Sequence, residues 1–321
     1  MIVACHFAVD GRFRFSKDAI TINRLWTQFI SMGGYLGDNI FVLISGYFLV
    51  SSSGLTLRKI LNIWSRVFFY SVVFWVLFYN FGSAPIGIKK TIKSFMPLLF
   101  NQNWFATCWL MMYLIHPYIN TLLKNLSRDE YIKMLLITGL CVSVIPIFTK
   151  TDYCGNLGRF IFLYCIAGFF RLHAPDFGSK KFIWLGIAGI ILNFLVVIVF
   201  DYLGLMFPKF ADNATYFYKI NSPTTVLIAT SFLIGFRSLN INYSRVINTI
   251  ASAAFGVYLI HGNIFMDPFL WCDVFKNASF QDSNYLIIYS IGVVIFVYVV
   301  CTVIELLRSK VFKIITRGYV S

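Results

Sequence analysis

The sequence predicts an all-α polytopic membrane protein, a transmembrane helix bundle of about ten spans. Three observations predict it: 59% of the 321 residues are hydrophobic, only 12% are charged, and the apolar residues gather in long runs. A typical soluble domain is about 25% charged, so the charged coat here is too sparse to keep this much apolar surface in water. The same composition excludes an intrinsically disordered chain.

Nine apolar segments are candidate spans, because a spanning helix needs about 20 mainly apolar residues. In chain order they are 35–50, 67–81, 104–120, 131–148, 157–171, 182–200, 223–236, 249–266 and 285–307. Residues 1–9 form a further apolar stub, which as a helix reaches only about 14 Å, less than half of a bilayer core of about 30 Å. We expect this stub to be the back half of a truncated or mis-started first helix. The whole chain, 1–321, is expected to form a single integral membrane domain.

The formal net charge of +14 comes from short basic clusters between the apolar runs. If the stub leaves the cytoplasm, most Lys and Arg residues and few acidic residues fall in alternate segments that face inward. The positive-inside rule then places both termini in the cytoplasm of a multi-pass protein of the plasma (inner) membrane. No basic stripe with interleaved aromatic residues occurs, so membrane lipid is an expected partner and nucleic acid is not.

The seven cysteines are spread singly, mostly inside apolar runs, and none forms a CxxC pair. This spacing indicates neither a zinc site nor a disulfide framework. We expect buried, small apolar side chains and no bound metal. A pair between Cys154 and Cys272 is the alternative.

Histidines inside apolar segments are the first candidates for chemistry, because ionisable groups within a bilayer are unfavourable. His6 lies in the stub, where a neutral imidazole can take a proton from a hydroxyl group and later return it. The alternative is a histidine hydrogen-bonded to a neighbouring helix. His261 lies toward the outward end of its span and by itself is more typical of a structural histidine, as are His116 and His173.

Polar residues occur at several other positions in or beside the spans. Asn39 lies at the top of the 35–50 span, and Ser45 next to Gly46 permits close approach between helices. Trp104 opens its span as an interfacial anchor. Glu305 can form an ion pair with the arginine three residues later on the same helix.

A basic cluster, Arg58, Lys59 and Arg66, lies in an inward segment and can hold phosphate groups. Its simplest alternative function is to set the orientation of the chain. No Walker loop, GxGxxG, GxSxG or HExxH motif is present in the sequence.

At these residues the sequence resembles the acyltransferase-3 family of integral membrane acyltransferases, over nearly the whole chain. Its closest resemblance is to the bacterial branch that O-acetylates surface polysaccharides. The segment 37–48 is similar to the family's glycine, acidic-or-amide, Ile-Phe, Ser-Gly-Phe/Tyr segment. Residues 104–117 are similar to its Trp-Phe…Tyr-Leu…Pro helix, and 250–261 (IASAAFGVYLIH) to its late S-x-x-x-Y-L-x-H helix.

The family signature is an arginine, ten residues and a histidine in the first helix. His6 occupies the histidine position, and the arginine would precede Met1. The resemblance implies transfer of an acetyl or other acyl group from acetyl-CoA or another acyl-CoA to a hydroxyl of a surface or exopolysaccharide sugar, or of a lipid-linked sugar. His6 would be the general base or a transient acyl carrier.

The resemblance also suggests roles for the other polar residues. The residues expected to bind the acceptor are Asn39, Ser45, Trp104, Tyr258 and His261, and those expected to bind the phosphates of CoA are Arg58, Lys59 and Arg66. Two alternatives remain, a transporter or flippase of lipid-linked sugars and an inactive, truncated family member. The sequence shows neither the internal repeats nor the paired broken spans that are common in transporters.

Overall fold

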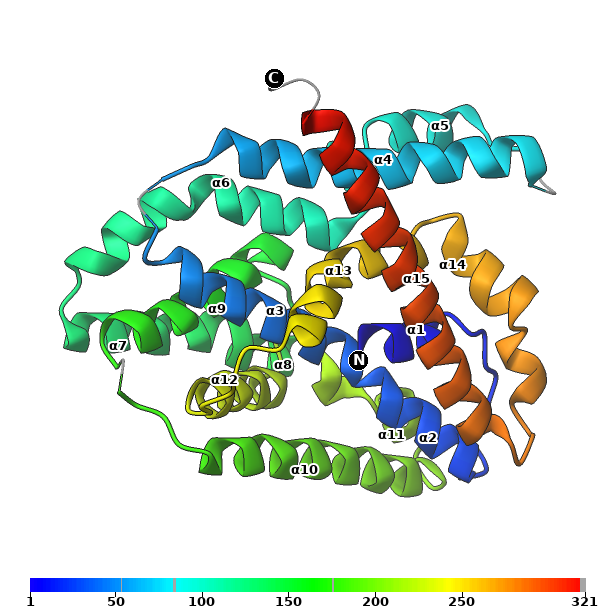
Figure 1. Cartoon of the computed structure of the whole chain (residues 1–321). Coiled ribbons are helices and arrows are strands. Elements are labelled where there is room, and N and C mark those ends of the chain that lie inside the picture. The colour runs from blue at the N-terminus through cyan, green and yellow to red at the C-terminus, as the bar shows by residue number, and fades with distance from the viewer. Residues whose placement is uncertain (53, 83–84, 175, 318–321) are drawn as a thin grey trace. The chain divides into compact units, whose positions relative to one another are not determined.

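The computed structural model describes residues 1–52, 54–82, 85–174 and 176–317 (Figure 1). The chain is 76% helical and has no strand within those ranges, which confirms the all-α class. It divides into two compact units. The first unit comprises Met1–Phe15, Asn62–Asn103 and Ile241–Ser321, and the second comprises Ser16–Leu61 and Trp104–Asn240. The single domain over 1–321 stays a prediction.

Several helices of the described chain are long and apolar enough to cross a membrane. Four pass this test singly: α4 (Leu57–Phe81), the continuous stretch Arg128–Thr149, α10 (Lys181–Gly204) and α15 within Leu286–Ile314. A fifth span is possible as a bent pair, Arg245–His261 with Met266–Phe280. These helices identify a membrane protein, and the count of about ten spans stays a prediction.

Eight of the nine predicted spans lie within helical segments and extend beyond them by at most one residue, although several of the helices are longer than predicted. The exception is 249–266, because α13 (Arg245–His261) ends at His261 and the chain turns by 91° into Met266–Phe280. Gly262 follows the helix, and the side chain of Asn263 accepts a hydrogen bond from the Phe265 N–H at 3.0 Å. A glycine followed by an Asx turn is a strong local signal for ending a helix.

The first unit is built around α15 (Leu286–Arg317), against which both α13 and α1 (Ile2–Val9) pack (Figure 1). The helix α5 (Ile88–Phe95) follows α4, and a chain of short turns follows α13. These turns are α14 (Met266–Pro268), the π-helical η3 (Phe269–Val274) and the 3₁₀-helical η4 (Asn277–Phe280).

The eight-residue helix α1 is held by its own packing. Phe7 is fully buried and its ring meets those of Trp271 and Tyr289 edge-on, at centroid distances of 6.0 and 6.2 Å. The side chain of Asn277 donates a hydrogen bond to the Phe7 carbonyl at 3.0 Å. These contacts fix the register and direction of α1, and therefore the position of His6.

A buried ionic cluster joins α4 to α15. Glu305 is 2% exposed and accepts hydrogen bonds from the Tyr70 hydroxyl at 2.6 Å and from Arg308 at 2.6 and 2.7 Å. Arg66 lies 3.7 Å from the same carboxylate. The predicted ion pair between Glu305 and Arg308 is confirmed, and the two residues from α4 extend it into a network.

Gly256 of α13 leaves room for this cluster. A Cβ atom at Gly256 would lie 2.4 Å from Cγ of Glu305 and 2.5 Å from its carboxylate, closer than real Cβ contacts occur. We expect Gly256→Ala to lower the free energy of unfolding by about 1–3 kcal/mol, as overpacking does. Gly292→Ala on α15 is the matched control, because a Cβ there meets nothing within 4 Å. Equal melting temperatures of the two variants in detergent would contradict this packing.

The second unit is centred on α3 (Gly33–Leu49), which packs against α9 and α12. Gly46 lies against α9, where its Cβ position is 3.1 Å from the Tyr164 backbone, so the close approach expected at Ser45-Gly46 is confirmed. The unit's elements are α2 (Ile22–Ser31), α3, α6 (Trp104–Asn125), α7 (Arg128–Gly139), η1 (Leu140–Val144), α8 (Ile145–Thr149), α9 (Gly155–Leu172), α10, α11 (Pro208–Asp212), η2 (Tyr216–Tyr218) and α12 (Pro223–Arg237).

A buried ion pair in the second unit has no counterpart in the sequence predictions. Arg24 of α2 lies 2.6 Å from Asp201 of α10, and both side chains are buried. A buried pair of this kind requires close geometry and further hydrogen bonds to offset its desolvation. Arg24 has them, since it also donates to the backbone carbonyls of Ser16 and Ala19.

All seven cysteines are free. Cys154 and Cys272 belong to different units, so the alternative of a disulfide between them stays a prediction. Burial is mixed: Cys165 and Cys301 are buried, whereas Cys141 and Cys154 are exposed.

Candidate active site

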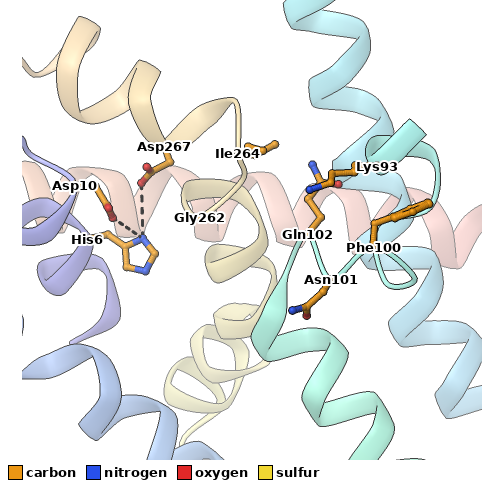
Figure 2. A pocket seen from close by; sticks show the side chains of 9 residues that line it. All are labelled: His6, Asp10, Lys93, Phe100, Asn101, Gln102, Gly262, Ile264 and Asp267. Atoms are coloured by element: carbon orange, nitrogen blue, oxygen red, sulfur yellow. Dashed lines mark ion pairs between the residues drawn. The ribbon is translucent and has the colours of Figure 1, made fainter. Parts of the chain in front are cut away.

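His6, on the last turn of α1, lies between two carboxylates of the first unit (Figure 2). Its Nδ1 atom is 3.3 Å from Oδ2 of Asp10 and 3.8 Å from Oδ1 of Asp267. Asp10 follows His6 by four residues, so the helix itself brings the two side chains to one face. The carboxylates can orient the imidazole with its proton on Nδ1, which leaves Nε2 free to accept a proton.

Asp267 reaches His6 because of the sharp bend after α13. It lies on α14, the first turn beyond the bend. The indole N–H of Trp271, a fully buried residue, donates a hydrogen bond to Oδ1 of Asp267 at 3.0 Å. The carboxylate is therefore held in place by a rigid neighbour.

His261, the last residue of α13, lies next to His6. The two imidazole centroids are 5.0 Å apart with their planes at 72°. His261 is 1% exposed, and its Nδ1 lies 2.5 Å from the Val257 carbonyl. The carbonyl can only accept, so Nδ1 carries the proton. Nε2 is then an acceptor, and it has no hydrogen-bond partner among the described residues.

These residues border a cavity of about 380 Å³. His6, Asp10 and Asp267 line one side, and Lys93, Asn101 and Gln102 line the other, with Gly262 and Ile264 between them (Figure 2). The cavity therefore combines a base, acids, a cation and neutral amides on one polar surface.

Gln102 presents an unused hydrogen-bond donor at this cavity. Its Oε1 accepts a hydrogen bond from the Ser71 hydroxyl at 2.9 Å. Its Nε2 is buried and has no hydrogen-bond partner among the described residues. Because a buried donor without a partner is unfavourable, this amide is suited to a carbonyl or hydroxyl oxygen of a bound ligand.

The pKa of Asp10 is raised from its ordinary value of 3.8 to about 6, and burial is the largest cause. The nearby carboxylate of Asp267 contributes to this rise, whereas His6 opposes it. The charge beside His6 therefore changes near neutral pH.

The same three side chains have the spacing of a metal site. One ligand atom from each of His6, Asp10 and Asp267 lies within 4.8 Å of the others. Three nitrogen and oxygen ligands with an open fourth position suit Zn²⁺. The absence of a metal stays a prediction, and the cluster is the place where a cation would bind.

Of the other predicted site residues in the first unit, neither Tyr258 nor Arg66 lines the cavity. Tyr258, on α13, stacks on Phe255 at a centroid distance of 6.4 Å. Arg66 takes part in the ionic cluster of Glu305. Only His261 is brought beside His6.

Five predicted site residues belong to the second unit. The Asn39 amide donates to the Ile220 carbonyl at 2.9 Å, and Ser45 accepts from the Trp109 indole at 3.2 Å. Trp104 opens α6 and packs edge-on against Phe105 and Phe160. Arg58 and Lys59 are exposed on the first turn of α4.

His116, also in the second unit, has partners at both ring nitrogens. Nδ1 lies 2.5 Å from the Tyr113 carbonyl, and Nε2 lies 2.9 Å from the Ser52 hydroxyl. The expectation of a structural histidine therefore fits its surroundings. The helix α6 continues past His116, through Pro117 to Asn125.

Four residues of the site were not predicted from the sequence: Asp10, Asp267, Lys93 and Gln102. Asp10 follows His6 by about one helical turn, and this spacing was a usable signal for the first carboxylate. The other three residues come from turns and a short helix, where no periodic pattern points toward His6.

The fold and the site together define a helical membrane protein with a histidine–carboxylate cluster at a polar cavity, an arrangement suited to acid–base chemistry. The model of the acyltransferase-3 family, described as an acyltransferase domain, matches residues 1–306. The chain therefore belongs to the acyltransferase-3 family, and this membership supports membrane acyltransferase activity. No curated protein and no solved structure matches the chain.

Proposed function

We propose that the protein is an O-acyltransferase of the bacterial polysaccharide-modifying branch of its family. It transfers an acetyl or other acyl group from acyl-CoA to a hydroxyl of a surface or exopolysaccharide sugar. The observation that carries this proposal is His6, held between two carboxylates at the edge of a polar cavity in a chain whose residues 1–306 match an acyltransferase domain.

His6 is the general base in this reaction. The sugar hydroxyl attacks the thioester carbonyl while its proton passes to Nε2 of His6, and the resulting imidazolium is stabilised by Asp10 and Asp267. The C–S bond then breaks, and the CoA thiolate leaves with the proton from the imidazolium. The products are the sugar ester and CoA, and His6 returns to its neutral form.

The amide groups at the cavity support the same reaction. The free Nε2 donor of Gln102 can stabilise the oxyanion that develops on the carbonyl oxygen. Tyr258, packed near His261, and Asn39, Ser45 and Trp104 of the second unit remain proposed acceptor-binding residues. Exposed Arg58 and Lys59, and Arg66, are proposed to bind the phosphates of CoA.

The proposal includes the position of the protein in the cell. We expect about ten spans in the inner membrane. The distribution of basic residues then places both termini in the cytoplasm, where acyl-CoA is available. Membrane lipid surrounds it, and its substrates are acyl-CoA and a polysaccharide or a lipid-linked sugar. No metal takes part in the proposed step.

Membranes that contain the full chain test this function. Incubated with ¹⁴C-acetyl-CoA and surface glycans, they should form an alkali-labile labelled ester on the glycan, with release of free CoA. Membranes without the protein are the control. Movement of unlabelled lipid-linked sugars with no ester formed would instead indicate a flippase. The absence of both ester formation and sugar movement would indicate an inactive family member.

The ionisation of Asp10 gives a pH-dependent prediction. Its pKa of about 6 means that it is charged at pH 8 and mostly neutral at pH 5. Asp10→Asn removes only the charge, so we expect the variant to be about tenfold slower at pH 8, with the deficit disappearing toward pH 5. The ratio of wild-type to variant rates, determined at each pH over this range, measures the effect. A constant ratio would remove Asp10 from the mechanism.

A cation at the cluster would compete with base catalysis. Zn²⁺ bound to Nδ1 of His6 would displace the proton that keeps Nε2 basic and would neutralise both carboxylates. We therefore expect acyl transfer to survive EDTA and to be inhibited by added Zn²⁺, measured as labelled ester formed. Loss of activity in EDTA and recovery with Zn²⁺ would instead indicate a metal-dependent enzyme.

A further inference from the structure

A second cavity of about 370 Å³ adjoins the His6 cavity within the first unit, and Ile264 lines both. Aromatic and proline side chains form most of its wall, namely Phe78, Phe81, Pro85, Phe265, Pro268 and Phe269. Phe78 stacks on Phe265 at 5.7 Å and meets Phe269 edge-on at 5.5 Å. A polar cavity and an aromatic one are therefore contiguous.

Two lysines of α5 line the two cavities, one lysine in each. Lys90 lines the aromatic cavity and Lys93 lines the polar one. They are three residues apart, so the helix presents them on neighbouring turns of one face. The hydrogen bond from the Trp75 indole to the Thr91 hydroxyl, 3.1 Å long, fixes α5 to α4.

Neither lysine forms an ion pair with a carboxylate among the described residues. The carboxylates that line the two cavities are Asp273, which is exposed at the aromatic one, and Asp10 and Asp267, which are engaged with His6. Two ammonium groups without a carboxylate partner among the described residues thus line adjoining cavities, Lys90 the apolar one and Lys93 the polar one. This order of surfaces matches a ligand with an apolar part, an anionic linker and a polar head.

We propose that the acceptor sugar reaches His6 as the head group of a lipid, linked through a phosphate or diphosphate to a long apolar chain. The chain lies in the aromatic cavity, the phosphate lies between Lys90 and Lys93, and the sugar lies beside His6. This inference rests on the proposed function for the sugar and names the class of acceptor. A free polysaccharide would have neither a chain for the aromatic cavity nor a phosphate for the lysines.

Binding of three probes to the full chain tests the inference, in phosphatidylcholine nanodiscs and without acyl donor. Farnesyl diphosphate carries the apolar chain and the charge, farnesol carries only the chain, and inorganic diphosphate carries only the charge. We expect farnesyl diphosphate to bind at least tenfold more tightly than either of the others. The double variant Lys90→Gln, Lys93→Gln should weaken its binding by about tenfold or more and leave farnesol unchanged.

Lys89→Gln is the matched control, since Lys89 lies on the same helix, is exposed and lines neither cavity. It should bind farnesyl diphosphate as the wild type does. Equal binding of farnesol and farnesyl diphosphate would overturn the inference in favour of a plain apolar chain. The same binding is also measured in nanodiscs of anionic phosphatidylglycerol. Loss of farnesyl diphosphate binding there would overturn the inference, because ordinary anionic lipid would then occupy the same site. Because no acyl donor is present, these results are independent of whether acyl transfer to a free glycan succeeds.

Discussion

Replacing His6 by glutamine should lower the rate of acyl transfer by about 10² to 10⁴-fold, the usual contribution of a general base. Glutamine keeps a polar side chain of similar size on the last turn of α1 but cannot take up a proton. Phe7 and the Asn277 contact that hold α1 are unchanged, so the variant should insert and melt as the wild type does. Labelled ester formed per mole of protein in the membrane measures the effect.

His173→Gln is the control for this variant. His173 lies at the end of α9 in the second unit and packs against the ring of Tyr131, outside the proposed machinery. Its rate should equal that of the wild type. Wild-type acyl transfer by the His6 variant would exclude His6 as the base, and loss of the protein from the membrane would assign it a structural role instead.

Replacing Glu305 by glutamine should lower the free energy of unfolding by about 3–5 kcal/mol. Removing one partner of a buried ion pair leaves the other charge without compensation in a medium of low polarity. Arg308 is 6% exposed and Arg66 is 23% exposed, so the cluster would keep two guanidinium groups and no carboxylate. A lower melting temperature in detergent measures the loss.

Two further variants show whether the lost charge is the cause. Asp282→Asn removes an exposed carboxylate of the same unit and should leave the melting temperature unchanged. The double variant Glu305→Gln, Arg308→Gln should lose less stability than the sum of its single variants, because it removes both members of the pair. Additive losses would mean that the two side chains do not act as a pair.

The sequence predicted the helices well wherever a long apolar run defined them. Eight of the nine predicted spans lie on helices, because membrane-length apolar runs have few other stable structures. It did not predict α2 or α5, which are short and carry charged residues among the apolar ones. The predicted span 249–266 also extends beyond the end of α13 at His261, because the residues after Gly262 are apolar although they form a turn.

The candidate site was predictable only in part. His6 and His261 were each singled out as ionisable groups in apolar segments, but no pattern in the sequence showed that their rings lie 5.0 Å apart. Asp267 joins them only through the bend, and no sequence pattern showed that Arg66 of the basic cluster lies 3.7 Å from the Glu305 carboxylate. Such pairings depend on tertiary packing between distant segments, which leaves no local periodicity.

The bend after α13 also governs when the histidine–carboxylate cluster can form during synthesis. His6 and Asp10 are translated more than 250 residues before Asp267 and the turn that holds it. A nascent chain therefore carries its imidazole with one carboxylate for most of translation. All three side chains can meet only after the bend beyond α13 has been synthesised, so a polypeptide that stops before Asp267 would lack the complete cluster.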